Sequence, residues 1–381
     1  MRGTPSRRRL RALVSSLAPP HTHPILSSSH QQAPAAAGAS GIDGPLSAED
    51  LRHWDEEGYV VLATGAAPEQ LRAVRDEIWR LAQRDEADPD TWYRKLPPNA
   101  SRSGTRLPFG PATDSVDPPR GQADLEVHML GLWQTDAQWQ IRQLPRIHLA
   151  FTQLWGTREL WVEVDCVNLK PPCSDLHPGW GGHTYCHWDW DLAAEGLGIQ
   201  GALYLADTGI NGGGFRCMPG FSARFNADAV FREKTMAWRA AAGDNAPGGC
   251  KDLAEVTGLP VVTLPGRAGD VKQRCFLDFF VTLPVSLTLQ APLLQLVIWN
   301  SLLPHGNARN TAQTARQAMF LTYKPVEQYA AADGGIERVR EQRVEGWREG
   351  NAGEAARSGG APWRPAALTP LGERLLGSAE W

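Results

Sequence analysis

The stretch Leu160–Lys170, LWVEVDCVNLK, marks the change from a helical to a strand period in this sequence. Apolar side chains recur at every second position from Leu160 to Cys166 and therefore share one face of a β-strand. Similar stretches follow, separated by turns such as Asn211–Gly214. We expect these strands at His187–Asp191, Ile199–Ala206, Phe215–Met218, Val261–Leu264, Leu296–Asn300 and Arg316–Tyr323. The centre of the chain is therefore predicted to be rich in β-structure.

Helical patterns flank these strands. Ser47 and Asp50 form a capping box for a first helix, which ends at Gly58 before a strand. A second helix begins at Pro68, and a third stretch, Asp136–Trp155, is interrupted by Pro145. Beyond the strands, Ile336–Gly346 and Thr369–Leu376 have helical spacing, whereas Thr91–Arg120 has the composition of a loop. The sequence predicts a mainly β fold with flanking helices, a sandwich or jelly roll.

Composition narrows the class of protein. Of the 381 residues 42% are hydrophobic, which is typical of a globular chain rather than a disordered one. The net charge of −4 does not favour a nucleic-acid partner, because such binding uses a basic face. Six cysteines without a CxxC pair indicate reduced thiols in an intracellular compartment rather than a disulfide framework.

Residues 1–42 differ from the rest of the chain. They contain five arginines, many Ser, Ala and Pro residues, and no acidic residue. This composition fits a mitochondrial or plastid transit peptide, and a disordered tail on a cytoplasmic protein is the alternative. Without this leader the remaining chain has a net charge of −9, so its body is more acidic than the whole.

A second unusual segment is residues 271–295, VKQRCFLDFFVTLPVSLTLQAPLLQ, which lacks glycine in a glycine-rich chain. Pro284 and Pro292 argue against a membrane-spanning helix. A buried strand pair is one alternative. The other is an insertion or retained intron, because its removal joins Gly269-Asp270 directly to the strand at Leu296 without a change of frame. A main transcript carrying these 75 nucleotides would contradict the intron hypothesis.

Two histidines and one aspartate carry the clearest chemical signal. His187 and Asp189 are two residues apart, so on a strand both side chains project from the same face. His305 follows an apolar strand much later in the chain, in a predicted turn. Two histidines with one carboxylate form the facial triad of non-haem Fe(II) oxygenases, which leaves coordination positions open. Arg316 opens the next strand and could bind a dicarboxylate in a bidentate manner.

Around these residues the chain resembles the phytanoyl-CoA dioxygenase family of Fe(II)- and 2-oxoglutarate-dependent oxygenases. The resemblance covers about residues 46–324. It rests on the motifs LSAEDLRHWDEEGYVVL at the start, NLKPP (168–172), HWD (187–189), NGGGFRCMPGFS (211–222) and VIWNSLLPHGNARN (297–310) with Arg316. It implies a double-stranded β-helix (jelly roll, cupin-like) core, in agreement with the strand pattern.

The resemblance also implies cofactors and roles. Fe(II) would be bound by His187, Asp189 and His305, and the cosubstrate 2-oxoglutarate by Arg316 with Asn307. With O₂, such an enzyme hydroxylates a small organic or lipid-like substrate and releases succinate and CO₂. Retention of Asp189 argues against a halogenase, in which chloride takes the place of that carboxylate. No contact is assigned to Lys170 of the KPP turn. The identity of the substrate and the oligomeric state are not predicted.

The chain departs from the family pattern at several points. The usual PGSH is replaced by Pro219-Gly220-Phe221-Ser222, and Ala202 occupies a position where relatives often have Trp. Segment 271–295 lies where relatives run directly into the strand before His305. The first two differences leave the substrate open. The third difference raises the question of whether the chain folds with segment 271–295 present.

The sequence leaves alternatives to this metal site and to this function open. Cys186 with His177, His183 and His187 could form a zinc site, although no second cysteine pair completes it. Asp191 could replace Asp189 as a ligand. A non-catalytic jelly roll that binds a metal or small molecule is the second candidate function. The expected organisation is a leader at 1–42, an oxygenase domain at 43–330 and a C-terminal helical extension at 331–381.

Overall fold

The computed structural model describes residues 42–94, 96–97, 100, 129–178, 180–181, 186–189, 192, 196, 198–242, 249–266, 295–332, 334–350 and 363–381. The predicted leader lies outside these ranges except for Ile42, and segment 271–295 lies outside them except for Gln295. The transit peptide, the insertion and the division into domains therefore stay predictions.

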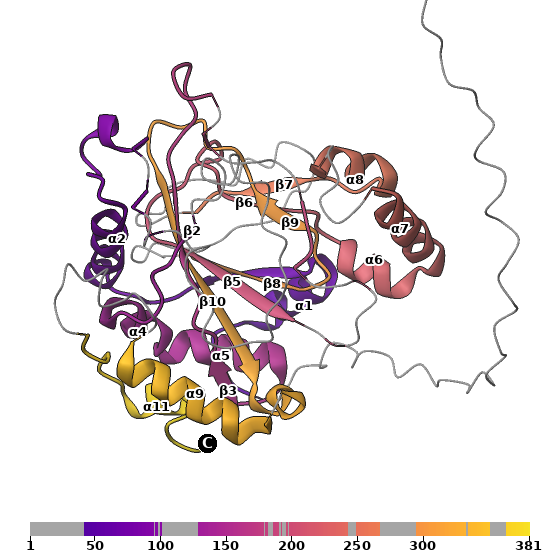
Figure 1. Cartoon of the computed structure of the whole chain (residues 1–381). Coiled ribbons are helices and arrows are strands. Elements are labelled where there is room, and N and C mark those ends of the chain that lie inside the picture. Colours follow the sequence, from indigo (N-terminus) through magenta and orange to yellow (C-terminus); the bar gives the residue numbers. More distant parts are fainter. Residues whose placement is uncertain are drawn as a thin grey trace, which may run out of the picture. The chain divides into compact units, whose positions relative to one another are not determined.

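Two antiparallel sheets form the centre of the fold (Figure 1). The larger has seven strands in the order β1-β8-β5-β10-β4-β2, with β3 paired to β10, and the smaller has the order β7-β6-β9. Their bounds are β1 Tyr59–Ala63, β2 Met129–Leu130, β3 Leu160–Val162, β4 Val167–Lys170, β5 Ile199–Tyr204, β6 Phe215–Cys217, β7 Val262–Leu264, β8 Gln295–Asn300, β9 His305–Asn307 and β10 Arg316–Pro325.

The chain crosses repeatedly between the two sheets, as in a jelly roll. From β5 in the larger sheet it passes to β6 and β7 in the smaller, returns to β8, crosses to β9 and returns to β10. Side chains of β5, β6 and β8 fill the space between the sheets, and the rings of Phe215 and Trp299 lie 4.6 Å apart there. Among the described residues no strand pair joins the sheets, so this double-stranded β-helix is open.

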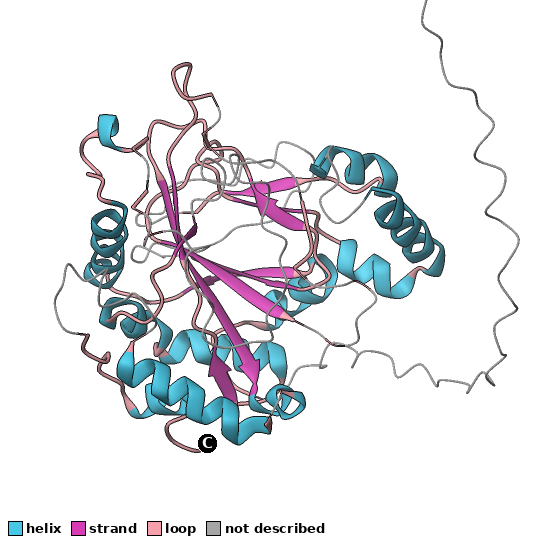
Figure 2. Ribbon diagram, in the orientation of Figure 1, coloured by secondary structure: helices cyan, strands magenta, loops and turns pink. Residues whose placement is uncertain are grey.

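Helices cover the outer face of the larger sheet and extend one end of the smaller (Figure 2). They are α1 Ala48–Glu57, α2 Pro68–Ala82, α4 Asp136–Arg142, α5 Pro145–Trp155, α6 Phe221–Ala227, α7 Ala229–Ala242, α8 Gly249–Thr257, α9 Gly335–Glu349 and α11 Pro370–Leu376, with 3-10 turns η1 Pro89–Thr91 and η3 Val326–Ala331. Apolar residues of α2 and α5 pack on β1, β5, β8 and β10 in the main core. This agrees with the predicted mainly β fold with helices outside.

The predicted strand Leu160–Lys170 is divided by a β-bulge. Val162 is opposite Tyr323 and Val167 is opposite Met319, so five steps along one strand face four along the other. A bulge inserts one residue and reverses which face the following side chains occupy. Val162 and Val167 accordingly lie in the same core cluster, although they differ in parity. The prediction of one shared face from Leu160 to Cys166 is therefore wrong beyond Val162.

Three other details differ from the sequence prediction. Of the expected strand His187–Asp191 the structure describes residues 187–189, where His187 forms an isolated bridge with His305 and no strand is present. His305 begins strand β9 instead of lying in a turn. The helices α6, α7 and α8, which together span 221–257 with a gap at 243–248, were not predicted.

Gly58 is a position where the backbone requires glycine. It ends α1 with φ of +85°, in the left-handed region, and an added Cβ would lie 2.9 Å from Ser222 Oγ. We expect Gly58→Ala to lower the free energy of unfolding by about 1–3 kcal/mol, from left-handed strain plus this contact. Gly209→Ala is the control, because an added Cβ there meets nothing within 4 Å. Equal urea midpoints for both variants would contradict the prediction.

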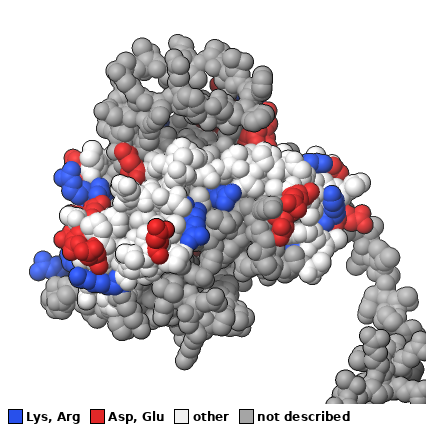
Figure 3. All heavy atoms as spheres, turned by 90° about the horizontal axis from the view of Figure 1, so that it is seen from above, with Lys and Arg blue, Asp and Glu red and all other residues white. Residues whose placement is uncertain are grey.

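Three further features of the described residues concern membrane spans, surface charge and cysteines. None of the helices in the described ranges has the length and apolarity needed to cross a membrane. On the face drawn in Figure 3, basic and acidic side chains of the described residues are interspersed. Cys166, Cys173, Cys186 and Cys217 are not joined in disulfides.

Candidate metal centre

His305 is positioned by strand β9 and by the turn before it. The strand pairs His305 with Cys217 of β6, and the side chain is buried. The ring atom Nδ1 lies 3.0 Å from the carbonyl oxygen of Leu303. Because a carbonyl oxygen can only accept, Nδ1 carries a proton, so Nε2, which faces Asp189, is the ring atom that could bind a metal.

His187 and Asp189 come from the segment that precedes β5. The backbone of His187 exchanges two hydrogen bonds with that of His305, with N···O distances of 2.8 and 3.1 Å. Between the two polar residues, the indole of Trp188 donates to the carbonyl of Leu302 and packs beside Phe221. Trp188 thus lies in the cluster formed with α6, α7 and α8, as expected for a side chain that faces away from the pair.

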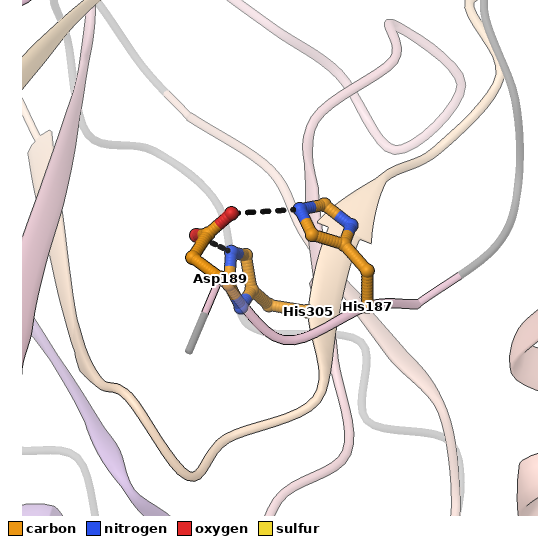
Figure 4. Close-up of side chains that lie close together, drawn as sticks. All are labelled: His187, Asp189 and His305. Carbon is orange, nitrogen blue, oxygen red and sulfur yellow. Dashed lines mark ion pairs between the residues drawn. The ribbon is translucent and has the colours of Figure 1, made fainter. Parts of the chain in front are cut away.

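The three predicted ligands converge (Figure 4). His187 Nε2 lies 3.3 Å from Asp189 Oδ1, and His305 Nε2 lies 3.1 Å from Asp189 Oδ2. Metal–ligand bonds of about 2.1 Å at right angles place neighbouring ligand atoms about 3 Å apart. The donor set is that of a facial triad, and these two spacings are compatible with ligands to a single metal ion.

The electrostatics of Asp189 favour the ionised form that a metal needs. Burial opposes ionisation, but the imidazole of His305 and then that of His187 outweigh it and hold the pKa of the Asp189 carboxyl well below its usual range. About a third of this side chain is exposed, so the carboxylate can be approached from solvent.

The alternative zinc site is not favoured by the described residues. Among the described residues, the potential metal ligands that lie together are His187, Asp189 and His305, whose ligand atoms are within 4.8 Å of one another. Cys186 is not part of this cluster. His183 and Asp191 lie outside the described residues.

Arg316, at the start of β10, is buried with only 2% of its surface exposed. Its Nη1 donates to Asn168 Oδ1 at 3.0 Å, and its guanidinium lies 5.5 Å from the Tyr204 ring centroid. The Nε and Nη2 atoms are buried, and no described group accepts a hydrogen bond from them. These two atoms form the edge of a guanidinium that binds a carboxylate in a bidentate manner.

Lys170 is a second buried cation that sequence reasoning left without a role. It is directly opposite Arg316 in the β4–β10 register, so both side chains leave the same face of the sheet. Burial, and then the charge of Arg316, lower the pKa of Lys170 well below its ordinary value. Neither cation forms an ion pair with a described carboxylate. Such a pair of desolvated positive charges is costly unless an anion binds to it.

A chain of contacts joins Arg316 to His305. The ring of Tyr204 lies against the Arg316 guanidinium, and the Tyr204 hydroxyl accepts a hydrogen bond from the Phe215 backbone at 2.7 Å and donates to the carbonyl of Leu264 at 2.9 Å. The Phe215 ring is stacked 5.8 Å from the ring of His305. Asn307 is opposite Phe215 in β9, two residues after His305 and therefore on the same face.

No protein-family model matches the chain. A curated relative, Ava biosynthesis cluster protein O of Aspergillus versicolor, is 25% identical over 177 residues, which cover 45% of this chain and 49% of that protein. The chain thus matches only about half the length of this relative. Membership of the phytanoyl-CoA dioxygenase family stays a prediction.

Several solved structures are similar at low identity. EctD from S. alaskensis, with 2-oxoglutarate and 5-hydroxyectoine, is 16% identical, covers 77% of this chain and 81% of its own, and has a TM-score of 0.45. SnoK, a non-haem α-ketoglutarate-dependent carbocyclase from nogalamycin biosynthesis, is 18% identical, with coverage of 76% and 87% and a TM-score of 0.42. SnoN, an epimerase solved with Fe³⁺ and α-ketoglutarate, is 14% identical, with coverage of 72% and 82% and a TM-score of 0.42.

Proposed function

We propose that the chain is an Fe(II)- and 2-oxoglutarate-dependent dioxygenase that hydroxylates a small organic or lipid-like substrate and releases succinate and CO₂. The observation that carries the proposal is the pairing of two features. A His-Asp-His cluster and a buried guanidinium edge that has no acceptor in the described part of the chain are joined through Tyr204 and Phe215.

Each residue has a distinct role in this proposal. His187, Asp189 and His305 bind the iron, and Asp189 contributes the negative charge. Arg316 donates from Nε and Nη2 to the distal carboxylate of 2-oxoglutarate, while Asn307 lies on the side of the metal ligands and contacts the same cosubstrate. The bound iron and 2-oxoglutarate, with O₂, supply the oxidising chemistry.

Lys170 extends the carboxylate site in this proposal. Its ammonium group leaves the same face of the sheet as Arg316, so both positive charges can act on a single carboxylate. Tyr204 does not compete for that carboxylate, because its hydroxyl already donates to the carbonyl of Leu264. Binding of the cosubstrate would thus offset the desolvation cost of the two cations.

The direct experiment measures succinate formed from 2-oxoglutarate by purified protein with Fe(II) and a broad panel of substrates. It should use both the full chain and a form lacking residues 271–295, since that segment is a predicted insertion. We expect iron-dependent succinate release, even if uncoupled from hydroxylation, and its loss in His187→Ala. Absence of iron-dependent turnover in both forms would favour a non-catalytic binding protein.

A second test concerns Lys170. We expect Lys170→Met to weaken 2-oxoglutarate binding about tenfold, as for one charged hydrogen bond. Titration calorimetry with Mn(II) in place of Fe(II) measures this, and Lys234→Met, at an exposed position on α7, is the control. Unchanged affinity in Lys170→Met would show that the ammonium does not contact the cosubstrate.

The lowered pKa of Lys170 also predicts that the stability of the protein depends on pH. The folded chain lowers the pKa of Lys170, so in the range from that lowered value up to about 10.4 the unfolded chain binds more protons. The stability of the metal-free protein should therefore gain a rising contribution with pH in this range. Lys170→Met should lack that contribution in urea titrations at a series of pH values. Identical pH slopes in the two proteins would contradict it.

A further inference from the structure

Asn300, the last residue of β8, organises the turn that leads to His305. Its side-chain Oδ1 accepts three hydrogen bonds, from Ser222 Oγ at 2.8 Å and from the backbone N–H groups of Leu302 and Leu303 at 3.1 Å each. Asn300 is only 7% exposed, so water cannot readily reach Oδ1 and take the place of these donors. Together with the backbone hydrogen bond from Leu303 N–H to the carbonyl of Asn300 at 3.1 Å, this oxygen holds the conformation of the chain immediately before the metal ligand.

The turn places the carbonyl group of Leu303 next to the His305 ring. This carbonyl accepts the hydrogen bond from His305 Nδ1 at 3.0 Å, and the Leu303 residue itself is fully buried. The next carbonyl, of Pro304, accepts from the backbone of Met218 at 3.1 Å and holds the turn against the smaller sheet. A shift of the Leu303 carbonyl would move the acceptor that sets the orientation and tautomer of the His305 ring.

Ser222 connects this turn to a different part of the fold. It lies in the first turn of α6, within the Pro219–Ser222 stretch that departs from the family pattern, and is buried. The backbone N–H of Asn300 is in turn held by the carbonyl of Gly58 at 3.1 Å. Helix α6 thus contacts the side chain of Asn300 and the end of α1 contacts its backbone, and neither helix contains a metal ligand.

We infer that Asn300 and Ser222 are positioning residues for the metal centre: they hold the Leu303 carbonyl where it orients His305, and so they set metal affinity without touching the metal. The inference rests on the proposed function, because it assumes that His305 is a metal ligand. It goes beyond that proposal by assigning a role to two residues outside the His-Asp-His set.

The test measures binding of Co(II) alone to the full chain, followed by the visible absorption of the bound ion, together with the melting temperature of the metal-free proteins. Asn300→Leu removes the acceptor and should weaken Co(II) binding about 10- to 100-fold. Ser222→Ala removes one donor and should weaken it about fivefold. Asn300→Asp keeps an oxygen at the same place and should recover most of the affinity lost in Asn300→Leu.

Ser301→Ala is the matched control. Its hydroxyl lies in the same turn and accepts one buried hydrogen bond, from the Gly198 backbone at 3.0 Å, but it does not contact the amides that Asn300 binds. A merely structural role would make Ser222→Ala and Ser301→Ala alike in melting temperature and in Co(II) affinity, whereas we expect only Ser222→Ala to lose affinity.

The outcomes separate the inference from the proposed function. Co(II) affinity within about threefold of wild type in folded Asn300→Leu overturns the inference, as does equal affinity of Ser222→Ala and Ser301→Ala, which decides the matter if Asn300→Leu does not fold. A wild-type chain that binds no Co(II), or a His305→Ala variant that binds it as tightly as wild type, overturns both the inference and the proposed function.

Discussion

Replacement of Asp189 by alanine should weaken metal binding more than about 100-fold, beyond the range seen for residues that only support a ligand. Asp189 lies within 3.3 Å of both imidazoles and is the carboxylate of the three-residue cluster. Without it, two imidazoles remain, and they provide neither the negative charge nor the third ligand of the facial triad. Iron-dependent succinate release should fall to background in the same variant.

Asp175→Ala is the control for this prediction. Asp175 lies in the segment between β4 and β5, as Asp189 does, but it is exposed and is not part of the metal cluster. Its loss should leave Co(II) affinity unchanged. Retention of tight Co(II) binding by Asp189→Ala would remove the carboxylate from the ligand set.

Replacement of Arg316 by methionine should weaken 2-oxoglutarate binding about 100-fold or more, since two charge-assisted hydrogen bonds are lost. The second expected effect has the opposite sign. The guanidinium is buried without an ion-pair partner among the described residues, so an apolar side chain of similar length should leave the melting temperature of the ligand-free protein unchanged or raised. Calorimetric titration of 2-oxoglutarate and thermal unfolding measure the two effects.

Arg216→Met provides the comparison. Arg216 is in β6, between the inward-facing Phe215 and Cys217, so its side chain leaves the other face of the strand. Its loss should not alter 2-oxoglutarate binding. An Arg316→Met protein that binds 2-oxoglutarate as wild type does would refute the carboxylate assignment, whatever its stability.

Much of the candidate site could be predicted because its signals are local. His187 and Asp189 are two residues apart, and Arg316 opens an apolar strand shortly after His305. The helix caps were equally readable, since Ser47 and Asp50 form the predicted capping box and Gly58 ends the helix. These features depend on residues within one turn or one strand of each other.

Lys170 shows where the period of two fails. Counted without interruption from Leu160, Lys170 falls on the face of the apolar side chains that pack under the helices. The bulge between Val162 and Val167 moves it to the face that carries Arg316. A bulge depends on how two strands pair across the sheet, and one strand alone does not reveal it.

The helices at 221–257 were missed for a related reason. Phe221 and Phe225 are four residues apart in α6, but they lie in a cluster with Trp188, which comes from the segment before β5. The segment around His187 was also wrongly predicted to be a strand. Its polar and apolar residues alternate as in a strand, but His187 forms an isolated bridge with His305 instead of strand pairing. In both cases tertiary contacts decide the local structure.

The position of β10 has a consequence for how the chain matures on the ribosome. Of the described strands it is the last to be synthesised, yet it lies between β5 and β4 and pairs with β3 as well. Until residues 316–325 leave the exit tunnel, β5 and β4 keep unpaired edges that can associate with other chains. Nascent chains stalled before β10 should therefore stay protease-sensitive and bound to chaperones, and full protection should arise only after β10 has emerged.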